Sequence, residues 1–122
     1  MMSNLVCMSF SSQAQGDADA VHGFVAPVGL TLVGVTVYPE AFTGEPTGFN
    51  VDVNVGETEV VKALAANTAG AAGEWKAGHL GGSKVAVAIA SGAAVTLDVN
   101  LAGGTTPTAD YDVHLWLLEG TV

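Results

Sequence analysis

The sequence predicts an all-β protein, a single-domain β-sandwich of about seven or eight strands that is jelly-roll-like or immunoglobulin-like. One observation is a pattern that occurs twice, VDVNVG at residues 51–56 and LDVNL at residues 97–101. Strict alternation of apolar and polar residues is typical of a strand with one face in a core and the other in water. Another is the position of the 16 glycines and 4 prolines, which fall mostly between such segments. A chain of 122 residues fits one domain.

The N-terminal half contributes four expected strands, at residues 4–11, 20–26, 30–38 and 49–55. The turn signals APVG and TGEPTG separate the later ones. The stretch between the first two is polar and small, which favours a linker. We therefore expect residues 1–19 to form an N-terminal arm or edge strand plus linker, and residues 20–122 to form the sandwich. A frayed terminus is an alternative, and an arm could grip a neighbouring subunit by strand addition.

The C-terminal half contributes the other four, at residues 59–64, 84–90, 94–101 and 111–119. VGE precedes the first, Ser91-Gly92 indicates a hairpin turn before the third, and AGGTTP precedes the last. Alanines between residues 58 and 72 would suit a helix, but Gly70 and Gly73 interrupt them and Val60-Val61 favours a strand followed by a loop.

Charge limits the classes of partner. Three lysines, no arginine and twelve carboxylates give a net charge of −9. Nucleic acid and an anionic membrane surface would both repel such a chain, so neither is an expected partner. The acidity is typical of a surface that keeps a β-rich protein soluble, and adaptation to salty surroundings is the alternative.

Cys7 is the single cysteine, so no disulfide can form within the chain, and its apolar neighbours predict a buried, inert thiol. No apolar run is long enough for a transmembrane helix, and the first ten residues lack the basic start of a secretory signal. We therefore expect synthesis in the cytoplasm.

Residues that could carry chemistry do not form a recognisable pattern. His22, His79 and His114 lack metal-ligand spacing, and no Gly-x-Ser-x-Gly elbow occurs. Asp52 and Asp98 could suggest a glycosidase pair, but each sits in mid-strand near an asparagine, as exposed positions of an ordinary sheet do. We expect no enzyme activity, no cofactor and no metal.

Aromatic residues leave one binding alternative open. Trp75, Trp116, Tyr38 and Tyr111 could form a platform on which sugars stack, which would make the chain a carbohydrate-binding module of a tail or surface protein. Core and interface positions are the alternative for these four residues. Trp75 lies in an irregular, glycine-rich stretch that is expected to be a surface loop.

Three segments carry a family resemblance: FVAPVGLTLVGV at residues 24–35, PTGFNVDVN at residues 46–54 and VTLDV at residues 95–99. Together they resemble small β-sandwich modules of tailed bacteriophage virions, over about residues 20–118. In those modules an Ala-Pro hairpin precedes a Val-Asp-Val-Asn strand. This chain departs from them at residues 55–57, where Val-Gly-Glu stands in place of a Lys-Asn-Gly turn.

The resemblance implies a structural protein of the virion surface, either a capsid decoration (cement) protein or a head-fibre protein, that binds and stabilises the outer capsid. It implies as partners the major capsid protein or other virion subunits, and a homo-oligomer, with a trimer favoured. The N-terminal tract and the two tryptophans are the residues expected to bind the partner: Leu5, Val6, Met8, Phe10, Trp75 and Trp116.

Overall fold

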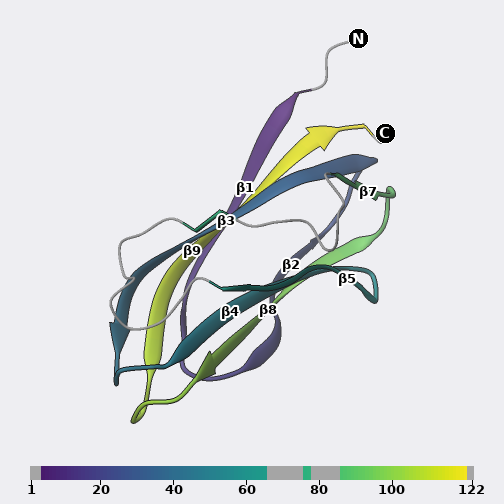
Figure 1. The fold of residues 1–122 in the computed structure, drawn as a ribbon. Helices are drawn as coiled ribbons and strands as arrows, with labels where there is room; N and C mark the ends of the chain where they lie inside the picture. Colours follow the sequence, from purple (N-terminus) through teal and green to yellow (C-terminus); the bar gives the residue numbers. More distant parts are fainter. Residues whose placement is uncertain (1–3, 66–75, 78–85, 121–122) are drawn as a thin grey trace.

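The computed structural model describes residues 4–65, 76–77 and 86–120, and these form an all-β sandwich, as the alternation predicted. Two antiparallel sheets lie face to face (Figure 1). The described strands are β1 (Leu5–Ala14), β2 (Ala18–Val25), β3 (Leu30–Thr43), β4 (Gly48–Val55), β5 (Thr58–Ala65), β6 (Lys76–Ala77), β7 (Val87–Ile89), β8 (Ala94–Ala102) and β9 (Thr108–Glu119).

The strand pairing is that of a jelly roll. One sheet has the order β1-β9-β3-β6, with β7 also paired to β3, and the other has the order β2-β8-β4-β5. The first strand therefore pairs with the last, β2 pairs with β8, and β4 pairs with β5 across the turn at Gly56. Such nested pairing is a long antiparallel ribbon rolled into two sheets, so it selects the jelly roll over the immunoglobulin alternative.

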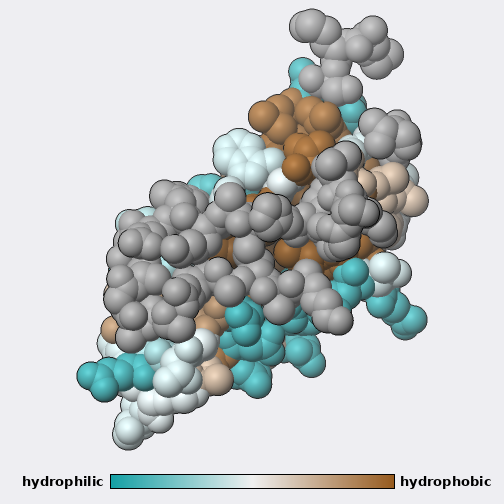
Figure 2. Space-filling model, viewed as in Figure 1, coloured by the Kyte–Doolittle hydropathy of each residue, from teal (hydrophilic) through white to brown (hydrophobic). Residues whose placement is uncertain are grey.

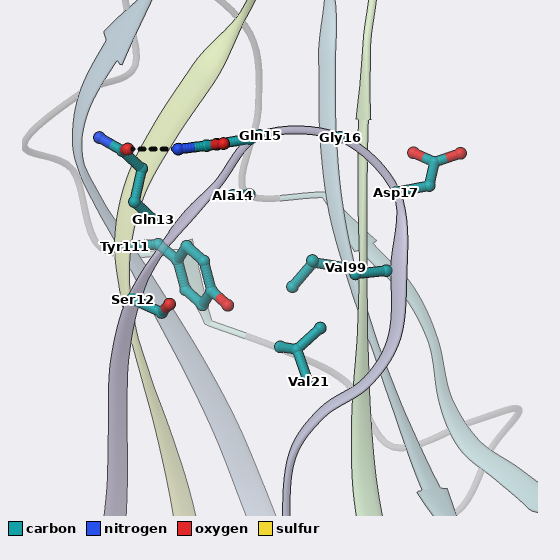
Figure 3. A pocket seen from close by; sticks show the side chains of 10 residues that line it. Ser12, Gln13, Ala14, Gln15, Gly16, Asp17, Val21, Val99 and Tyr111 are labelled. Atoms are coloured by element: carbon teal, nitrogen blue, oxygen red, sulfur yellow. Dashed lines mark hydrogen bonds between the residues drawn. The ribbon is translucent and has the colours of Figure 1, made fainter.

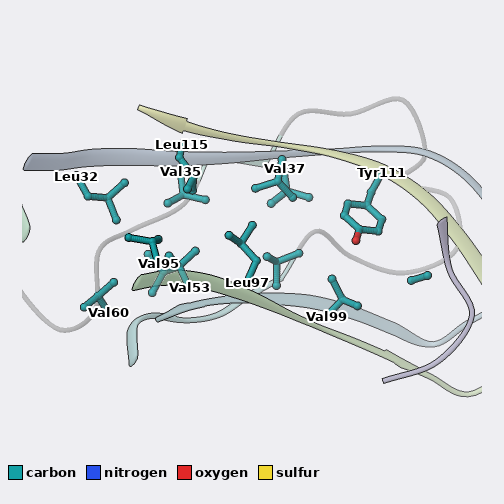
Figure 4. Packing of buried hydrophobic residues seen from close by; sticks show 14 of the residues in the cluster. Leu32, Val35, Val37, Val53, Val60, Val95, Leu97, Val99, Tyr111 and Leu115 are labelled. Atoms are coloured by element: carbon teal, nitrogen blue, oxygen red, sulfur yellow. The ribbon is translucent and has the colours of Figure 1, made fainter. Parts of the chain in front are cut away.

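Inward-facing residues of both sheets fill the space between them (Figure 4). Along β8 and β9 every second residue is buried, which is the period expected for strands with one face in a core. Tyr111 and Phe49 are the largest fully buried side chains, and their ring centroids lie 5.2 Å apart. Asp52 and Asp98 fall on the opposite, outward phase of β4 and β8, as predicted.

The first strand is longer than expected and the connection after it is shorter. Residues 11–14, expected to belong to a linker, continue β1 and pair with residues 109–112 of β9. The cause is a set of cross-strand bonds that the polar side chains make: the Ser11 hydroxyl donates to Asp112, and the Gln13 amide donates to Asp110 over 2.7 Å. β2 begins at Ala18. Because β1 comes first in the order of its sheet and pairs with β9, it is an edge strand.

Other predicted elements also shift. β3 continues past Tyr38 to Thr43, with a register shift between Pro39 and Ala41 that accommodates the proline. The turn at Ser91-Gly92 is present, but it is not a hairpin, because β7 pairs with β3 in one sheet and β8 belongs to the other. Residues 84–85 of a predicted strand and residues 66–75 lie outside the described residues.

Candidate interaction surface

Four of the predicted partner-binding residues lie on β1, and the strand's geometry divides them between two faces. Val6, Met8 and Phe10 point in the same direction as the buried core residues that they oppose on β9, whereas Leu5 points outward opposite Leu118. Leu5 is 59% exposed and Val6 is 46% exposed. On the inner face Val6 and Ser12 are exposed, Met8 and Phe10 are half-buried, and Ala14 is buried. The beginning of β1 is therefore uncovered on both faces.

Apolar surface gathers at this end of the molecule. Figure 2 shows a patch of hydrophobic residues near the end where β1 begins and β9 finishes, and hydrophilic residues mainly along the lower side of the view. On the outward face of the sheet, Leu5 and Cys7 of β1 stand opposite Leu118 and Trp116 of β9. We call these four residues, together with Val6, the β1-end patch.

Cys7 contradicts its sequence-based prediction, because the thiol is exposed. Its neighbours in the chain are apolar, but it points outward opposite Trp116, where no second layer covers it among the described residues. The apolar neighbours show that the segment is apolar, but they do not show which of its residues face the core.

Trp116 lies half-buried on the outward face of β9, as its phase predicted. Its indole nitrogen donates to the Thr36 hydroxyl over 3.3 Å, its ring meets His114 edge-on at 6.3 Å, and it lies opposite Gly34, which has no side chain. Trp75, the other predicted tryptophan, lies outside the described residues.

The outward face becomes acidic farther along β9. Asp112 accepts from Ser11 and Asp110 accepts from Gln13, and Glu40 of β3 lies close to both carboxylates. A hydrogen bond with Asp112, followed by the charge of Asp112, raises the pKa of Glu40. The outward face of this sheet is therefore apolar at the β1-end patch and negatively charged at its opposite end.

Aromatic side chains connect β1 to the core on the inner side. Phe10 stacks on His22 with ring centroids 5.1 Å apart, and the His22 Nε2 lies 3.0 Å from the Tyr111 hydroxyl. Burial lowers the pKa of His22 and is the main cause that raises the pKa of Tyr111. Phe10 is therefore partly committed to internal packing. The role of these β1 residues in binding a partner stays a prediction.

The predicted aromatic platform is not assembled by the described residues. Tyr111 is buried in the core, whereas Trp116 and Tyr38 are on the outward face of the same sheet. Tyr38 stands opposite Asp112 of β9, and Asp112 is four residues along that strand from Trp116. The two rings therefore do not share a patch.

Asp52 and Asp98 stand opposite each other on the outward face of the second sheet. Each accepts from a neighbouring amide: Asn100 donates to Asp52 over 3.3 Å and Asn54 donates to Asp98 over 3.0 Å. Asp98 also accepts from the backbone N–H of Ala20 over 2.7 Å. These carboxylates hold strands β2, β4 and β8 together and do not converge in a cleft.

A pocket of about 360 Å³ lies beneath the β1–β2 connection. Val21, Val99 and the ring of Tyr111 point into it, and Gln13 and Gln15 bond to each other at its rim (Figure 3). The Asp17 carboxylate accepts from the backbone N–H of Leu101 over 2.8 Å, which fixes the connection. Among the described residues, no group of three or more histidines, cysteines and carboxylates could hold a metal ion.

No protein-family model and no curated protein matches the sequence. Among solved structures, the chain is similar to a chain of the cyanophage Pam1 capsid asymmetric unit, with a TM-score of 0.63 and 17% sequence identity. The likeness covers 97% of this chain and 86% of that chain. It therefore extends over nearly the whole sandwich, and at this identity it shows a shared fold. The part of the chain that the structure describes includes no helix long and apolar enough to cross a membrane.

Proposed function

We propose that this chain is a structural protein of a phage virion, a capsid decoration protein that binds the outer capsid surface and stabilises the shell. The observation that carries the proposal is the fold that it shares with a chain of a phage capsid asymmetric unit. Because the likeness covers most of both chains, it relates two small sandwiches of similar size and not a fragment of a large subunit.

The described surface supports a binding role. Its outward carboxylates on the second sheet bond to amides of neighbouring strands, and its most exposed apolar side chains include Leu5 and Val6 at one end of the sandwich. Exposed apolar residues gathered in one place are typical of a protein interface. We assign the chain no catalytic role and no cofactor. Its partners on the particle would be the major capsid protein or other virion subunits, and a trimer is the homo-oligomer expected there.

Decoration is preferred over a head fibre because of the shape of the described domain. The beginning of β1 and the finish of β9 lie at the same end of the sandwich (Figure 1). If that end binds the capsid, the rest of the acidic sandwich faces the solvent. This arrangement suits a subunit that covers the capsid shell.

Particle binding tests the proposal. The chain would be expressed together with the major capsid protein of the same phage genome, and washed particles would be analysed by sedimentation and by the ratio of the two proteins. We expect the wild-type chain on particles at a fixed ratio. Leu5→Asp should reduce that ratio at least tenfold, because a charge is placed in the β1-end patch.

The matched control is Val25→Asp. Val25 is 63% exposed, comparable to Leu5, but it is the last residue of β2 in the other sheet and lies outside the β1-end patch. Particles that lack the wild-type chain after washing, or saturable glycan binding by the isolated chain without particle binding, would contradict the proposed function.

A further inference from the structure

Strand β1 leaves one edge of its sheet without a partner strand among the described residues. It heads the order β1-β9-β3-β6 and pairs with β9 along all ten of its residues. The N–H and C=O groups on its other side are therefore available to a further strand. Natural proteins usually protect such edges with charge, proline or a bulge, because an unprotected edge pairs with another chain.

The β1 edge has none of these protections. The strand reads LVCMSFSSQA, without charge, proline or glycine, and it pairs with β9 without a register shift. The edge strands of the other sheet differ. β2 contains Asp19 and Gly23 and shifts register against β8, and β5 contains Glu59 and shifts register against β4. Of these three edges, β1 is the best suited to strand addition.

Charge indicates what kind of strand the edge accepts. Every aspartate, glutamate and lysine of the chain occurs at or after Asp17, so β1 is neutral in a protein of net charge −9. Asp110 and Asp112 would attract a basic partner to the far half of β1, and Glu119, whose backbone N–H bonds to Asn4, adds a carboxylate beside its beginning. The residues around Cys7, by contrast, stand opposite uncharged residues of β9. An uncharged, alternating strand fits there, and β1 itself has that composition.

The inner face of β1 is incompletely covered in the same place. Val6 is 46% exposed and Met8 is half-buried, although both point toward the core side of the sheet. If a second β1 lies antiparallel beside the first, with Cys7 opposite Cys7, then Val6 of each copy stands beside Met8 of the other on that inner side. Each copy then covers the apolar β1 residues of the other copy that the other copy's second sheet leaves exposed.

We propose that two copies of this chain pair through β1, antiparallel, about a two-fold axis at Cys7. Charge supports this register of the two β1 strands, as does the burial of Val6 and Met8. Moving the axis toward Ser11 would bring the Asp112 carboxylates of the two copies together, since Asp112 bonds to Ser11 on the adjacent strand. With the axis at Cys7, Leu5 stands opposite Ser9, and the acidic ends point away from each other. The pairing is a property of the free protein and does not depend on the virion role.

The mass of the free protein tests the pairing. Light scattering after size exclusion should give twice the 12.2 kDa chain mass, or an even multiple of it, for the wild-type chain at concentrations near 100 µM. Val6→Asp should halve that mass, because two carboxylates would meet beside the axis, and Val25→Asp, on β2, should leave it unchanged. Circular dichroism confirms that each variant is folded. A monomer, a trimer, or a mass that Val6→Asp does not lower would overturn the pairing.

Cross-linking of the single cysteine tests the register without disturbing the fold. Opposed residues of antiparallel strands have Cα atoms about 4.5–5.5 Å apart, within the range of a disulfide. Copper–phenanthroline in air passes the two electrons that a pair of thiols loses to dioxygen, which also takes up their two protons, and it should convert wild-type chain rapidly to a disulfide-linked dimer. The double variant Cys7→Ser/Ser9→Cys moves the thiol opposite Leu5 of the other copy, and we expect at least tenfold slower cross-linking. Equal rates for the two proteins would overturn the proposed register.

Discussion

At the scale of single residues, alternation predicted correctly which side chains of β4 and β8 face the core, whereas the prediction of a buried Cys7, made from its apolar neighbours, was wrong. Leu97 and Asp98 are neighbours in the chain, yet the leucine is fully buried and the aspartate lies outside, as their phase requires. Cys7 points outward on an edge strand, where no described residue forms a layer over it. The composition around a residue shows that its segment is apolar but not which face of the sheet that residue occupies, so this exposure could not be predicted.

Truncation of Leu97 should be costly. Its side chain is 0% exposed between the sheets, so Leu97→Ala should lower the free energy of unfolding by about 2–5 kcal/mol through lost burial and a residual cavity. Leu5→Ala, at a 59% exposed site, is the control and should change it by less than about 0.5 kcal/mol. Urea unfolding followed by tryptophan fluorescence in dilute solution gives both values, and equal losses would contradict the packing described here.

His22 should make stability depend on pH. Burial lowers its pKa in the folded chain below the ordinary value of 6.5, so the unfolded chain takes up a proton first as the pH falls. The contribution of neutral His22 is therefore complete above about pH 6.5 and is lost as the pH falls through the window below it.

The test compares unfolding free energies at pH 7.5 and pH 5.5 for wild type, His22→Gln and His114→Gln. The wild type should lose more stability between the two values than His22→Gln does. His114→Gln, which changes an outward-facing histidine on β9, should follow the wild type. If the two variants respond alike, His22 is not the group responsible.

At the scale of elements, strands with strict alternation were predicted nearly to the residue, and segments that depend on partners were not. β4 and β8 agree with the predicted ranges within one residue at each end. The last part of β1 was expected to be a linker because it is polar, but Ser11 and Gln13 bond to aspartates of β9, a strand that begins about a hundred residues later. Such long-range pairing leaves no signal in the local composition.

The β3–β4 and β8–β9 connections meet through glycines. Thr105 donates its backbone N–H to the carbonyl of Gly44 over 2.9 Å, and a Cβ at Gly104 would lie 2.0 Å from that carbonyl oxygen. Gly104 also has a φ of +69°. Gly104→Ala should therefore destabilise the fold by more than the roughly 1–2 kcal/mol of left-handed strain alone.

Gly56→Ala is the matched control for that substitution. Gly56 has a φ of +60° at the β4–β5 turn, but a Cβ there would meet nothing within 4 Å. Thermal and urea unfolding should rank wild type above Gly56→Ala, and Gly56→Ala above Gly104→Ala. The reverse order for the two variants would show that the connections do not pack as described.

At the scale of the whole molecule, the all-β sandwich followed from period and turns, whereas the choice of the jelly roll required the pairing of β1 with β9. Periodicity places residues on faces, but it does not say which strands are neighbours. Of the residues expected to bind a partner, Leu5 and Val6 are exposed at one end of β1, while Phe10 stacks against His22, and their role in binding stays a prediction. The unprotected edge of β1 emerged from the sheet order and not from the sequence pattern.

Net charge should set the salt dependence of association. Two copies that each carry −9 repel each other over a distance that salt shortens, while the neutral β1 contact itself is unaffected. Dimerisation should therefore strengthen as sodium chloride rises from 50 to 500 mM, measured by sedimentation equilibrium. A contact that depended on opposite charges would weaken over that range.

The most direct test of the central claim is cryo-electron microscopy of washed particles that contain the chain. We predict a two-sheet sandwich in density on the outer surface of the capsid, with the β1 end directed toward neighbouring subunits and the acidic outer surface of the second sheet exposed to solvent. Particles whose outer surface lacks this density, although the wild-type chain was present during assembly, would contradict a decoration role.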